Sequence, residues 1–487
     1  MSKVKAPLFE KLLSHYQSNP VSFHVPGHKT GQGFPSFGKK VFQDLLKIDM
    51  TEISGLDDLH QPNGVILEAE KKAASLFKAD QTFFLVNGST AGNLAMILAT
   101  CQPGDKIIVQ RNVHKSVIHG MILARAVPVY IDSEMIPSLG IPGSISLHTL
   151  KEVLKNHSDA KAIFLMNPNY YGIGIDLTEI INLAHLYQIP VLVDEAHGAH
   201  FGFHPDFPKS AIQMGADVVV QSTHKMLSAM TMGSMLHVKG TLIEIDRLKF
   251  FLSMVQSSSP SYPIMASLDL ARQGIEEHGE TLWKEILLGL DWFLEQTHSF
   301  QSIRLHHRIA SYYYQDPLKL IIHGIVGNIS GFVIQELLEE KGIYPELSDL
   351  FNTLLITSYG TTIDDLKRLL IVLKEIEQQL PLLSKKCNEK DFTKTFTDYP
   401  KNKFNESKVS LEQILYGRST TVPLEQAAGK IAAEMVIPYP PGIPVVQLGE
   451  EMTQEMINYL IALKNQGAKF QGVLDHQLKN IKVLEGK

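Results

Sequence analysis

Lys225 is the residue whose position in the sequence most clearly suits it to a chemical reaction. Residues 217–220 form an apolar run that predicts a short buried strand, and Gln221-Ser222-Thr223-His224-Lys225 follows it directly. Between His224 and the apolar run 226–233, the lysine amine should be partly desolvated and beside a second potential cation. Both effects favour the neutral, nucleophilic amine that forms a Schiff base. An ordinary surface lysine would also fit this pattern, so the ends of other strands decide between the two.

Two other predicted strands are followed by groups that would be needed beside a Schiff-base lysine. Residues 82–86 lead into Asn87-Gly88-Ser89-Thr90-Ala91-Gly92, a hydroxyl-rich helix N-terminus suited to holding a phosphate. Residues 190–193 lead into Asp194-Glu195-Ala196-His197. Ligands of an open α/β sheet bind outside the carboxyl ends of its strands, so phosphate cradle, acid and lysine should converge on one crevice. Pyridoxal phosphate requires this set, with the acid keeping the pyridine nitrogen protonated.

Each of these signals has a simpler explanation when taken alone. A short Gly-Ser-Thr turn can be a helix cap, and an aspartate at a strand end can be a cap or a salt-bridge partner. A metal could instead bind His197, His200 and His204 with Asp194 or Glu195, but their spacing is not a zinc signature and no metal site is predicted. Residues 191–197 also suit the acidic box of a DEAH helicase, but the chain has no Gly-x-x-x-x-Gly-Lys-Ser/Thr loop.

The elements that must position these residues predict an α/β fold. From Gly64 onward, helices alternate with short apolar strands at 82–86, 106–109, 128–131, 162–166, 190–193, 217–221 and 234–238. Continuous apolar strands separated by helices are typical of a mostly parallel sheet covered by helices on both faces.

Changes in composition and in the pattern of apolar residues divide the chain into five predicted segments. They are an irregular N-terminal arm (1–62), a large cofactor-binding domain (63–260), a smaller α+β domain (261–385), a lysine-rich linker (386–408) and a C-terminal domain (409–487). The small domain should contain helices at 264–298, 329–341 and 363–379 and strands at 318–323 and 354–357. In the last segment, Pro438-Tyr439-Pro440-Pro441-Gly442 predicts a rigid turn between two helical pieces.

Composition narrows the class of partner. The chain has 487 residues, of which 44% are hydrophobic and 20% charged, as in an ordinary globular protein of several domains. A net charge of −6 argues against nucleic acid or an anionic membrane as the main partner, so a small molecule is expected. No signal-peptide core and no run of roughly 18 uncharged apolar residues is present. With only Cys101 and Cys387, a reducing cytoplasm is the expected compartment.

A set of motifs spread over nearly the whole chain resembles the Orn/Lys/Arg decarboxylase family of pyridoxal-phosphate enzymes. The resemblance runs from about Phe23 to Glu450 in the family's order and is closest to the short Bacillus-type members, which resemble arginine or lysine decarboxylases. It starts almost at Phe23, so no amino-terminal wing domain is expected. The motifs are His24-Val25-Pro26-Gly27-His28-Lys29, Leu56-Asp57-Asp58-Leu59-His60, Arg111-Asn112-Val113-His114-Lys115-Ser116, Asp194 to His197, Ser222 to Lys225, Gly342 to Asp349, and Pro438 to Pro444.

This resemblance implies a fold type I pyridoxal-phosphate enzyme and a role for each site residue. Lys225 would be the Schiff-base lysine, Asp194 the partner of the pyridine nitrogen, and His114 would stack on the ring. His197 would reach the ring's phenolic oxygen or stack near it, although some members carry tryptophan there. Simple packing at a strand end is the alternative for both histidines. The cofactor phosphate would be held by Ser89, Thr90, Ser222 and His224, and across a homodimer or higher oligomer by Ser257 of the neighbouring chain.

The activity that the resemblance implies is decarboxylation of a basic L-amino acid, arginine first, then lysine or ornithine, to an amine that can serve as a polyamine precursor. A long cationic side chain needs a carboxylate at its far end, and the candidates are Asp57, Asp58, Glu346 and Asp349. An α-oxoamine synthase or related lyase is the alternative within the cofactor class, against which the matches before Gly64 and after Lys408 argue. A regulatory protein without activity is a second alternative, less compatible with retention of Lys225 and Asp194.

Overall fold

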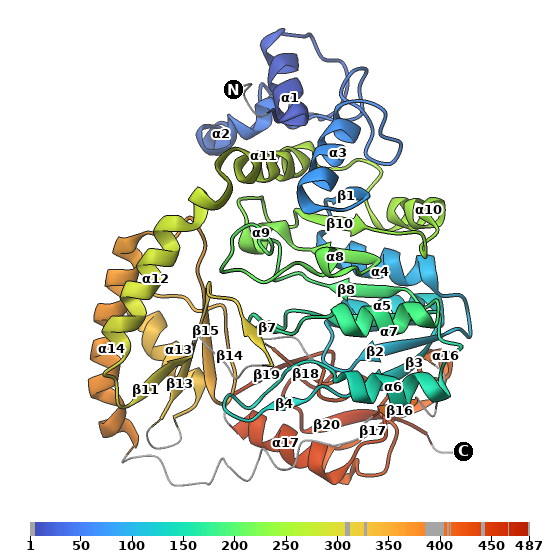
Figure 1. Cartoon of the computed structure of the whole chain (residues 1–487), viewed down its shortest axis with the longest axis vertical. Coiled ribbons are helices and arrows are strands. Elements are labelled where there is room, and N and C mark those ends of the chain that lie inside the picture. The colour runs from blue at the N-terminus through green and yellow to red at the C-terminus, as the bar shows by residue number, and fades with distance from the viewer. Residues whose placement is uncertain are drawn as a thin grey trace. The chain divides into compact units, whose positions relative to one another are not determined.

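The computed structural model in Figure 1 describes residues 5–306, 312–325, 329–384, 404–406, 409, 411–439, 444–465 and 467–485. The chain forms two compact units, and each unit is built from two separate stretches of sequence. The first unit contains residues 1–100 and 177–282, and the second contains residues 101–176 and 283–487. The predicted segment boundaries at 62, 260, 385 and 408 stay predictions.

In the first unit, four strands form a sheet in the order β1 (Gln81–Leu85), β10 (Ser234–Val238), β9 (Val218–Gln221) and β8 (Val191–Asp194). Strands β8 and β9 are parallel, whereas β10 and β1 are antiparallel to their neighbours. Every residue of β8, β9 and β10 is buried, as expected for strands covered on both faces. After the N-terminal arm, the α-helices of this unit are α3 (Val65–Phe77), α4 (Gly88–Thr100), α7 (Thr178–Leu186), α8 (Ala211–Met214), α9 (Thr223–Met226), α10 (Ile245–Val255) and α11 (Tyr262–His278).

The N-terminal arm is more regular than the sequence predicts. It contains helix α1 (Pro7–Gln17) and the shorter α2 (Ser36–Phe42) in place of an entirely irregular layer. Helix α1 begins with Pro7 in its first turn, where a missing N–H has no cost, and it buries Leu8 and Leu12 four residues apart. Figure 1 shows α1 lying against α3 and α11, so the arm begins as a packed part of the first unit.

A buried ion pair ties α1 to α11. Arg272 donates from Nη2 to Asp269 Oδ1 at 2.6 Å, and neither side chain is exposed. The same guanidinium nitrogen donates to the Lys5 carbonyl at 2.6 Å, while the other carboxylate oxygen accepts the Leu8 amide at 2.9 Å. Asp269 therefore neutralises a buried cation and caps the first turn of α1 at once.

Asp269→Ala should destabilise the protein by about 1–3 kcal/mol, because it removes one of the two carboxylates paired with the buried Arg272 guanidinium, leaving Glu276, and it also removes the partner of the Leu8 amide. Urea unfolding followed by circular dichroism measures this loss. Glu277→Ala, at an exposed position of the same helix, is the control and should change the free energy of unfolding by less than about 0.5 kcal/mol. Equal effects of the two substitutions would contradict the assigned role.

The second unit holds two larger sheets. One has the order β6 (Ala162–Met166), β2 (Lys106–Gln110), β3 (Val127–Ile131) and β16 (Phe404–Glu406), with the first three parallel and β16 antiparallel. The other is antiparallel, with the order β11 (Ile303–His306), β13 (Lys319–Gly324), β15 (Asn352–Ile356) and β14 (Leu347–Ser348). The helices of this unit include α5 (Lys115–Ala124), α6 (Leu147–Asn156), α12 (Lys284–Thr297), α13 (Gly331–Glu340) and α14 (Ile363–Ser384). Two short antiparallel pairs join β4 (Met135–Ile136) to β5 (Ile141–Pro142) and β7 (Ile173–Gly174) to β12 (Tyr314–Gln315).

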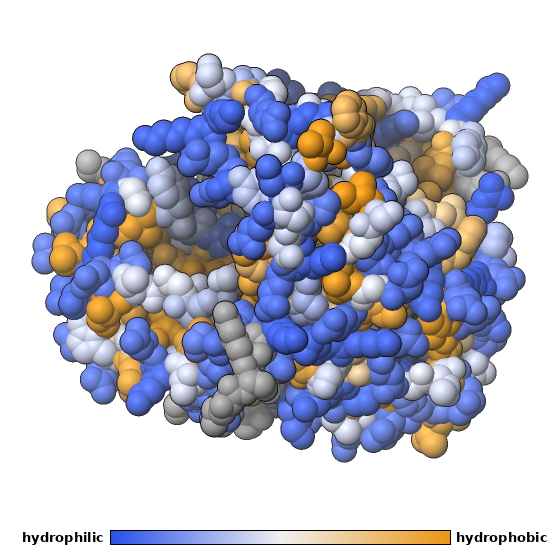
Figure 2. Space-filling model, turned by 90° about the horizontal axis from the view of Figure 1, so that it is seen from above, coloured by the Kyte–Doolittle hydropathy of each residue, from blue (hydrophilic) through white to orange (hydrophobic). Residues whose placement is uncertain are grey.

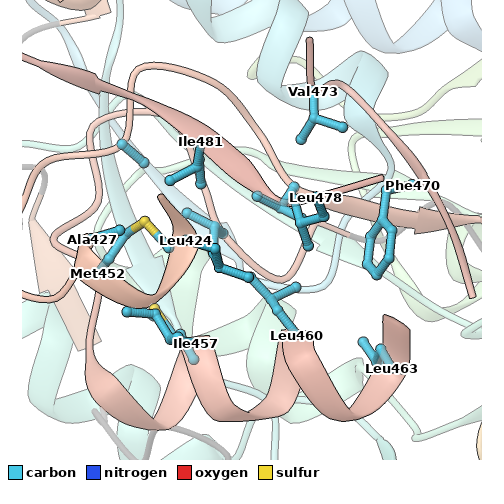
Figure 3. Close-up of a cluster of buried hydrophobic side chains, with 14 of the residues drawn as sticks. Leu424, Ala427, Met452, Ile457, Leu460, Leu463, Phe470, Val473, Leu478 and Ile481 are labelled. Atoms are coloured by element: carbon cyan, nitrogen blue, oxygen red, sulfur yellow. The ribbon is translucent and has the colours of Figure 1, made fainter. Parts of the chain in front are cut away.

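The C-terminal segment, residues 411–485, has its own hydrophobic core. Figure 3 shows Leu460 and Leu463 of one helix facing Phe470 and Leu478. The helices and strands of this segment are α16 (Leu411–Tyr416), β17 (Ser419–Pro423), β18 (Ile437–Tyr439), α17 (Gln454–Asn465), β19 (Lys469–Gln471) and β20 (Asn480–Leu484). Strands β17 and β20 pair antiparallel, as do β18 and β19.

Two local predictions need correction. Pro438 and Tyr439 were predicted to begin a rigid turn between helices, but they belong to strand β18, where proline is tolerated because β18 has a single partner strand. Pro440, Pro441 and Gly442 lie outside the described residues. The predicted linker contains strand β16, which pairs with β3 at the edge of its sheet.

The prediction of an α/β fold with a mostly parallel sheet is confirmed, because β8, β9, β6, β2 and β3 supply the parallel pairs. The face in Figure 2 carries mainly hydrophilic side chains, interrupted by small apolar groups. Among the residues that the structure describes, no helix is long and apolar enough to cross a membrane.

Candidate functional site

Lys225 lies in the short helix α9, immediately after strand β9. Its Nζ is 3.2 Å from Nε2 of His197, a hydrogen-bonding distance, and the lysine is half-buried while His197 is buried. The backbone holds the turn, because Lys225 N donates to the Ser222 carbonyl and His224 N donates to the Gly233 carbonyl. The predicted lysine therefore has a neighbouring imidazole that can exchange a proton with it.

Asp194 is the last residue of β8 and is buried. Its Oδ2 accepts a hydrogen bond of 2.8 Å from Nδ2 of Asn93, and its Oδ1 accepts one of 3.0 Å from the Ala196 amide. Asn93 comes from helix α4, so this helix orients the acid that the sequence predicts for the pyridine nitrogen.

Three serine hydroxyls gather where α4 and α9 begin. Ser89 Oγ lies 2.7 Å from Ser222 Oγ and 3.3 Å from Ser234 Oγ, and all three residues are buried. Ser89 stands in the first turn of α4, which is 13 residues long, and the next residue, Thr90, is exposed. Hydroxyl groups beside the N-terminus of a helix of this length suit a phosphate group.

Gly92 allows α4 to approach the sheet. A Cβ atom at this position would lie 2.5 Å from Cγ2 of Val220 and 3.0 Å from Cδ1 of Leu85. Real side chains do not come this close, so any larger residue would push α4 away from β9. The last glycine of the Gly-Ser-Thr-Ala-Gly run is thus needed for the packing that brings Ser89 to Ser222.

A buried chain of polar groups connects the four strands of the first unit. Glu195 accepts hydrogen bonds of 2.7 Å from Gln221 Nε2 and from the Ala211 amide, and Gln221 Oε1 lies 3.1 Å from His237 Nε2. His237 Nδ1 lies 2.8 Å from the hydroxyl of Thr82. Burial raises the pKa of Glu195 to about 8, against the effect of its hydrogen bonds, and lowers the pKa of His237 to about 3. A neutral His237 donates to Gln221 and accepts from Thr82. This series of hydrogen bonds holds together the ends of the strands that precede Glu195 and Ser222.

His114 lies in the second unit, at the N-cap of α5. Its Nδ1 accepts a hydrogen bond of 3.2 Å from the Ser116 amide and lies 2.8 Å from the Ser116 hydroxyl. Because Nδ1 accepts from a backbone amide, the neutral ring carries its proton on Nε2, and the orientation of the ring follows that of the loop.

Two further predicted phosphate ligands have contacts of their own. His224 Nδ1 lies 3.0 Å from the Gly233 carbonyl, so this nitrogen donates to it. Ser257 is exposed, its carbonyl accepts a hydrogen bond of 2.9 Å from His60 Nε2, and its Oγ accepts one of 3.2 Å from the Ser259 amide. The exposed position is compatible with a contact to another chain.

Asp57 has a structural function that its sequence motif does not indicate. Its carboxylate accepts hydrogen bonds from backbone amides on both sides of the start of α3, among them Asn63, Gly64 and Ile66. Burial raises its pKa, but the hydrogen bonds from the backbone outweigh this effect and hold the pKa below its usual value. The oxygens of Asp57 thus cap α3, which argues against a second function in holding a substrate cation.

The other three predicted substrate carboxylates differ in exposure. Asp349 accepts hydrogen bonds from the Tyr171 hydroxyl and from the Phe351 and Asn352 amides, and burial raises its pKa. Asp58 is half-buried and accepts from the His60 amide at 2.8 Å, whereas Glu346 is exposed.

The histidines considered as metal ligands point to different partners. His197 lies beside Lys225, His200 packs edge-on against Phe207, and His204 lies 3.6 Å from Asp206. Within the described ranges of the chain, no group of three His, Cys, Asp or Glu residues is arranged to hold a metal ion.

Sequence reasoning missed Asn93, Gln221 and Ser234, each of which contacts a predicted site residue or the polar chain behind it. Asn93 could have been found, because it follows Ser89 by four residues and therefore lies on the same face of α4. Gln221 and Ser234 could not, because their partners come from other strands.

Comparison with known proteins finds relatives over nearly the whole chain. The family described as Orn/Lys/Arg decarboxylase, major domain, matches residues 6–293, and its C-terminal domain matches residues 389–483. The chain is 42% identical to the protein YaaO of Bacillus subtilis, over 99% of this chain and 98% of the relative. It is 38% identical to the arginine decarboxylase of Bacillus subtilis, over 100% of this chain and 99% of the relative.

The fold has a counterpart among solved structures. The lysine decarboxylase LdcF of Francisella novicida superposes with a TM-score of 0.83 at 24% identity, covering 99% of this chain and 81% of that one. At this identity the likeness concerns the fold alone, and it extends over both units and the C-terminal segment.

Proposed function

The chain belongs to the Orn/Lys/Arg decarboxylase family, and from this premise we propose that it decarboxylates L-arginine in preference to lysine or ornithine, with pyridoxal phosphate as cofactor. The observation that carries the proposal is the placement of the Lys225 amine 3.2 Å from His197, at a strand end next to that of the buried Asp194. The likeness to proteins named arginine decarboxylase over the full chain supports arginine as the first choice.

The residues present suit pyridoxal phosphate. Buried serine hydroxyls at the start of α4 and α9 match a phosphate group, and the buried carboxylate of Asp194 matches a pyridine nitrogen that must stay protonated. The half-buried amine of Lys225 matches the aldehyde. When bound, the cofactor supplies a sink for the electrons that remain when carbon dioxide leaves.

Each residue of the site would then have its own role in the reaction. Lys225 would hold the cofactor through its amine, and His197 Nε2, 3.2 Å from Lys225 Nζ, would hold or move a proton at that nitrogen. Asp194, oriented by Asn93 and the Ala196 amide, places a negative charge where the ring nitrogen carries its proton. After decarboxylation, the Lys225 and His197 pair is the proposed donor of the proton that replaces the carboxylate on Cα.

From the family resemblance we also propose that His114 would stack on the cofactor ring and that Thr90 and His224 would help to hold the phosphate. Asp58, Glu346 and Asp349 are the candidates for the cationic end of the substrate, with Asp57 set aside because it caps α3. We also propose a homodimer that shares its sites through Ser257, and a cytoplasmic location, since the chain has only two cysteines.

A panel of single amino acids tests the proposed function. We expect arginine to give its amine and carbon dioxide with a kcat/KM at least about a hundredfold above that for leucine, because a pocket built for a cation is left with an unpaired carboxylate by an apolar side chain. Product amines are identified by mass spectrometry, with Lys225→Ala protein as the blank. Equal rates on leucine would remove the cationic pocket, and condensation of an amino acid with an acyl thioester would favour the α-oxoamine synthase.

A further inference from the structure

We propose that the C-terminal segment acts as a positioning element for the active site, because Glu450 holds Arg111 and thereby sets the orientation of His114. The inference rests on the proposed function, in which His114 contacts the cofactor ring. It assigns a purpose in catalysis to a contact between residues 339 positions apart in the sequence.

The ion pair is close and almost free of solvent. Arg111 Nη2 lies 2.5 Å from both carboxylate oxygens of Glu450, and the side chains are only 8% and 10% exposed. Asp132 Oδ1 is a more distant neighbour at 3.9 Å from Arg111 Nε. Glu450 is therefore the nearer of the two carboxylates beside Arg111, and loss of its charge would leave the buried guanidinium with the more distant Asp132.

The backbone of Arg111 is held from the same turn. Gln447 is fully buried and donates from Nε2 to the Arg111 carbonyl at 3.1 Å. The backbone N–H of Gln447 donates to Glu450 Oε2 at 3.0 Å, and this hydrogen bond keeps the turn 447–450 compact. Both the side chain and the main chain of Arg111 are therefore gripped by residues 447–450.

The other side of His114 has a matching contact. Lys115 Nζ donates to Gln471 Oε1 at 3.1 Å, so the residue after His114 and the residue three before it both contact the C-terminal segment. Between them, Asn112 Oδ1 accepts from Gln110 at 2.7 Å and from the Ser133 hydroxyl at 2.6 Å, which fixes the loop to the ends of β2 and β3. The loop 111–115 is clamped between the sheet and the C-terminal segment.

The clamp reaches the imidazole through the helix cap. The His114 ring accepts the Ser116 amide, so a shift of the loop turns the ring with it. Neutralising Glu450 removes the nearer carboxylate of the buried Arg111 guanidinium and leaves Asp132 at 3.9 Å, so we expect the loop to shift in a way that brings the guanidinium toward Asp132 or water. A displacement of about 1 Å in a positioning contact can lower turnover by roughly 10²-fold.

The test compares Glu450→Gln with Glu455→Gln, the same change at an exposed position in the first turn of α17. For Glu450→Gln we expect kcat to fall by about 10- to 100-fold while KM for the amino acid changes less than about twofold, since His114 contacts the cofactor and not the substrate side chain. Glu455→Gln should retain wild-type values. Glu450→Asp restores the carboxylate and should recover at least about tenfold in kcat over Glu450→Gln.

A second readout does not depend on activity. Exchange of the hydrogen on Cε1 of His114, followed by peptide mass spectrometry on cofactor-free protein, reports how the ring is held. It should become several-fold faster in Glu450→Gln and return toward wild type in Glu450→Asp. Should Glu450→Gln fail to fold, Lys115→Met, which removes only the Gln471 contact, should raise the same exchange rate to a smaller extent.

The two readouts separate failure of the inference from failure of the proposed function. Unchanged His114 exchange in folded Glu450→Gln, or in Lys115→Met where the first variant does not fold, overturns the positioning role. So does a Glu450→Asp protein no better than Glu450→Gln, because the carboxylate would then not be what holds the loop. A wild-type protein that does not decarboxylate basic amino acids refutes the proposed function, while His114 exchange still decides whether Glu450 positions the ring.

Discussion

Lys225→Ala is expected to lower turnover by at least about 10⁴-fold and to abolish the covalent bond between protein and cofactor. The amine of Lys225 is the group that we propose attaches the cofactor and exchanges with the substrate amine, and alanine can do neither. Borohydride reduction followed by intact-protein mass spectrometry measures covalently held cofactor, and release of carbon dioxide from arginine measures turnover.

The control for this prediction is Lys239→Ala, which removes a half-buried lysine just after β10 in the same unit. It should keep both the added mass and the turnover within about twofold of the wild type. The two variants should unfold at similar urea concentrations, because neither lysine is fully buried. A Lys225→Ala protein that still gains one cofactor per chain would assign the covalent bond to another lysine.

The sequence predicts the sheet and the main site residues because both depend on local patterns. The predicted strand at 217–221 is built on three consecutive valines, and strand β9 (Val218–Gln221) is buried at every residue. The chemistry-bearing residues Asp194 and Lys225 follow such runs directly, so locating the strands also locates the site edge. These predictions need only the order of strands along the chain.

The contacts that complete the site depend on distant partners, and local patterns do not reveal them. Asn93 orients Asp194 across 101 residues, and Glu450 pairs with Arg111 across 339. Asp57 is one of four candidates from the sequence for the cationic end of the substrate, because such a group needs a carboxylate, yet its own carboxylate caps a helix that begins eight residues later. A charged side chain in a loop can serve a ligand or the backbone, and only the folded loop distinguishes the two.

The regular helix α1 was missed for a related reason. The first 62 residues contain several glycines and prolines, which favour an irregular structure. Because of this composition, the amphipathic stretch in which Leu8 and Leu12 are buried was not recognised as a helix. Part of its stabilisation comes from Asp269 and Arg272, which no pattern within residues 1–62 contains.

A mixed dimer is expected to regain activity that neither parent possesses, if Ser257 completes the site of a neighbouring chain. Ser257 is exposed on the turn after α10, and its carbonyl accepts a hydrogen bond from His60, so its hydroxyl stands on a held turn at the surface of its own chain. In a twofold dimer each such residue is donated reciprocally. Ser257→Glu should abolish activity by placing a negative charge where the phosphate binds.

Chains carrying Lys225→Ala and chains carrying Ser257→Glu, co-expressed with different tags, provide the test. One site of each mixed dimer then contains both changes, while the other contains an intact Lys225 and an intact Ser257. Random pairing in equal amounts makes half of the dimers mixed, with one working site in two, so about a quarter of the wild-type activity should return. Dimers purified through both tags should show about half.

The matched control mixes chains carrying Lys225→Ala with chains carrying Asp194→Asn. Each of these residues belongs to the site of its own chain, since Asp194 ends β8 and Lys225 follows the adjacent parallel strand β9. Neither site of this mixed dimer is intact, so no activity should return. If the Ser257→Glu mixture is equally inactive although dimers carrying both tags are recovered, Ser257 acts within its own chain. Activity in the first mixture and not in the second is possible only if a residue crosses the interface, because every other pairing leaves a defect in each site.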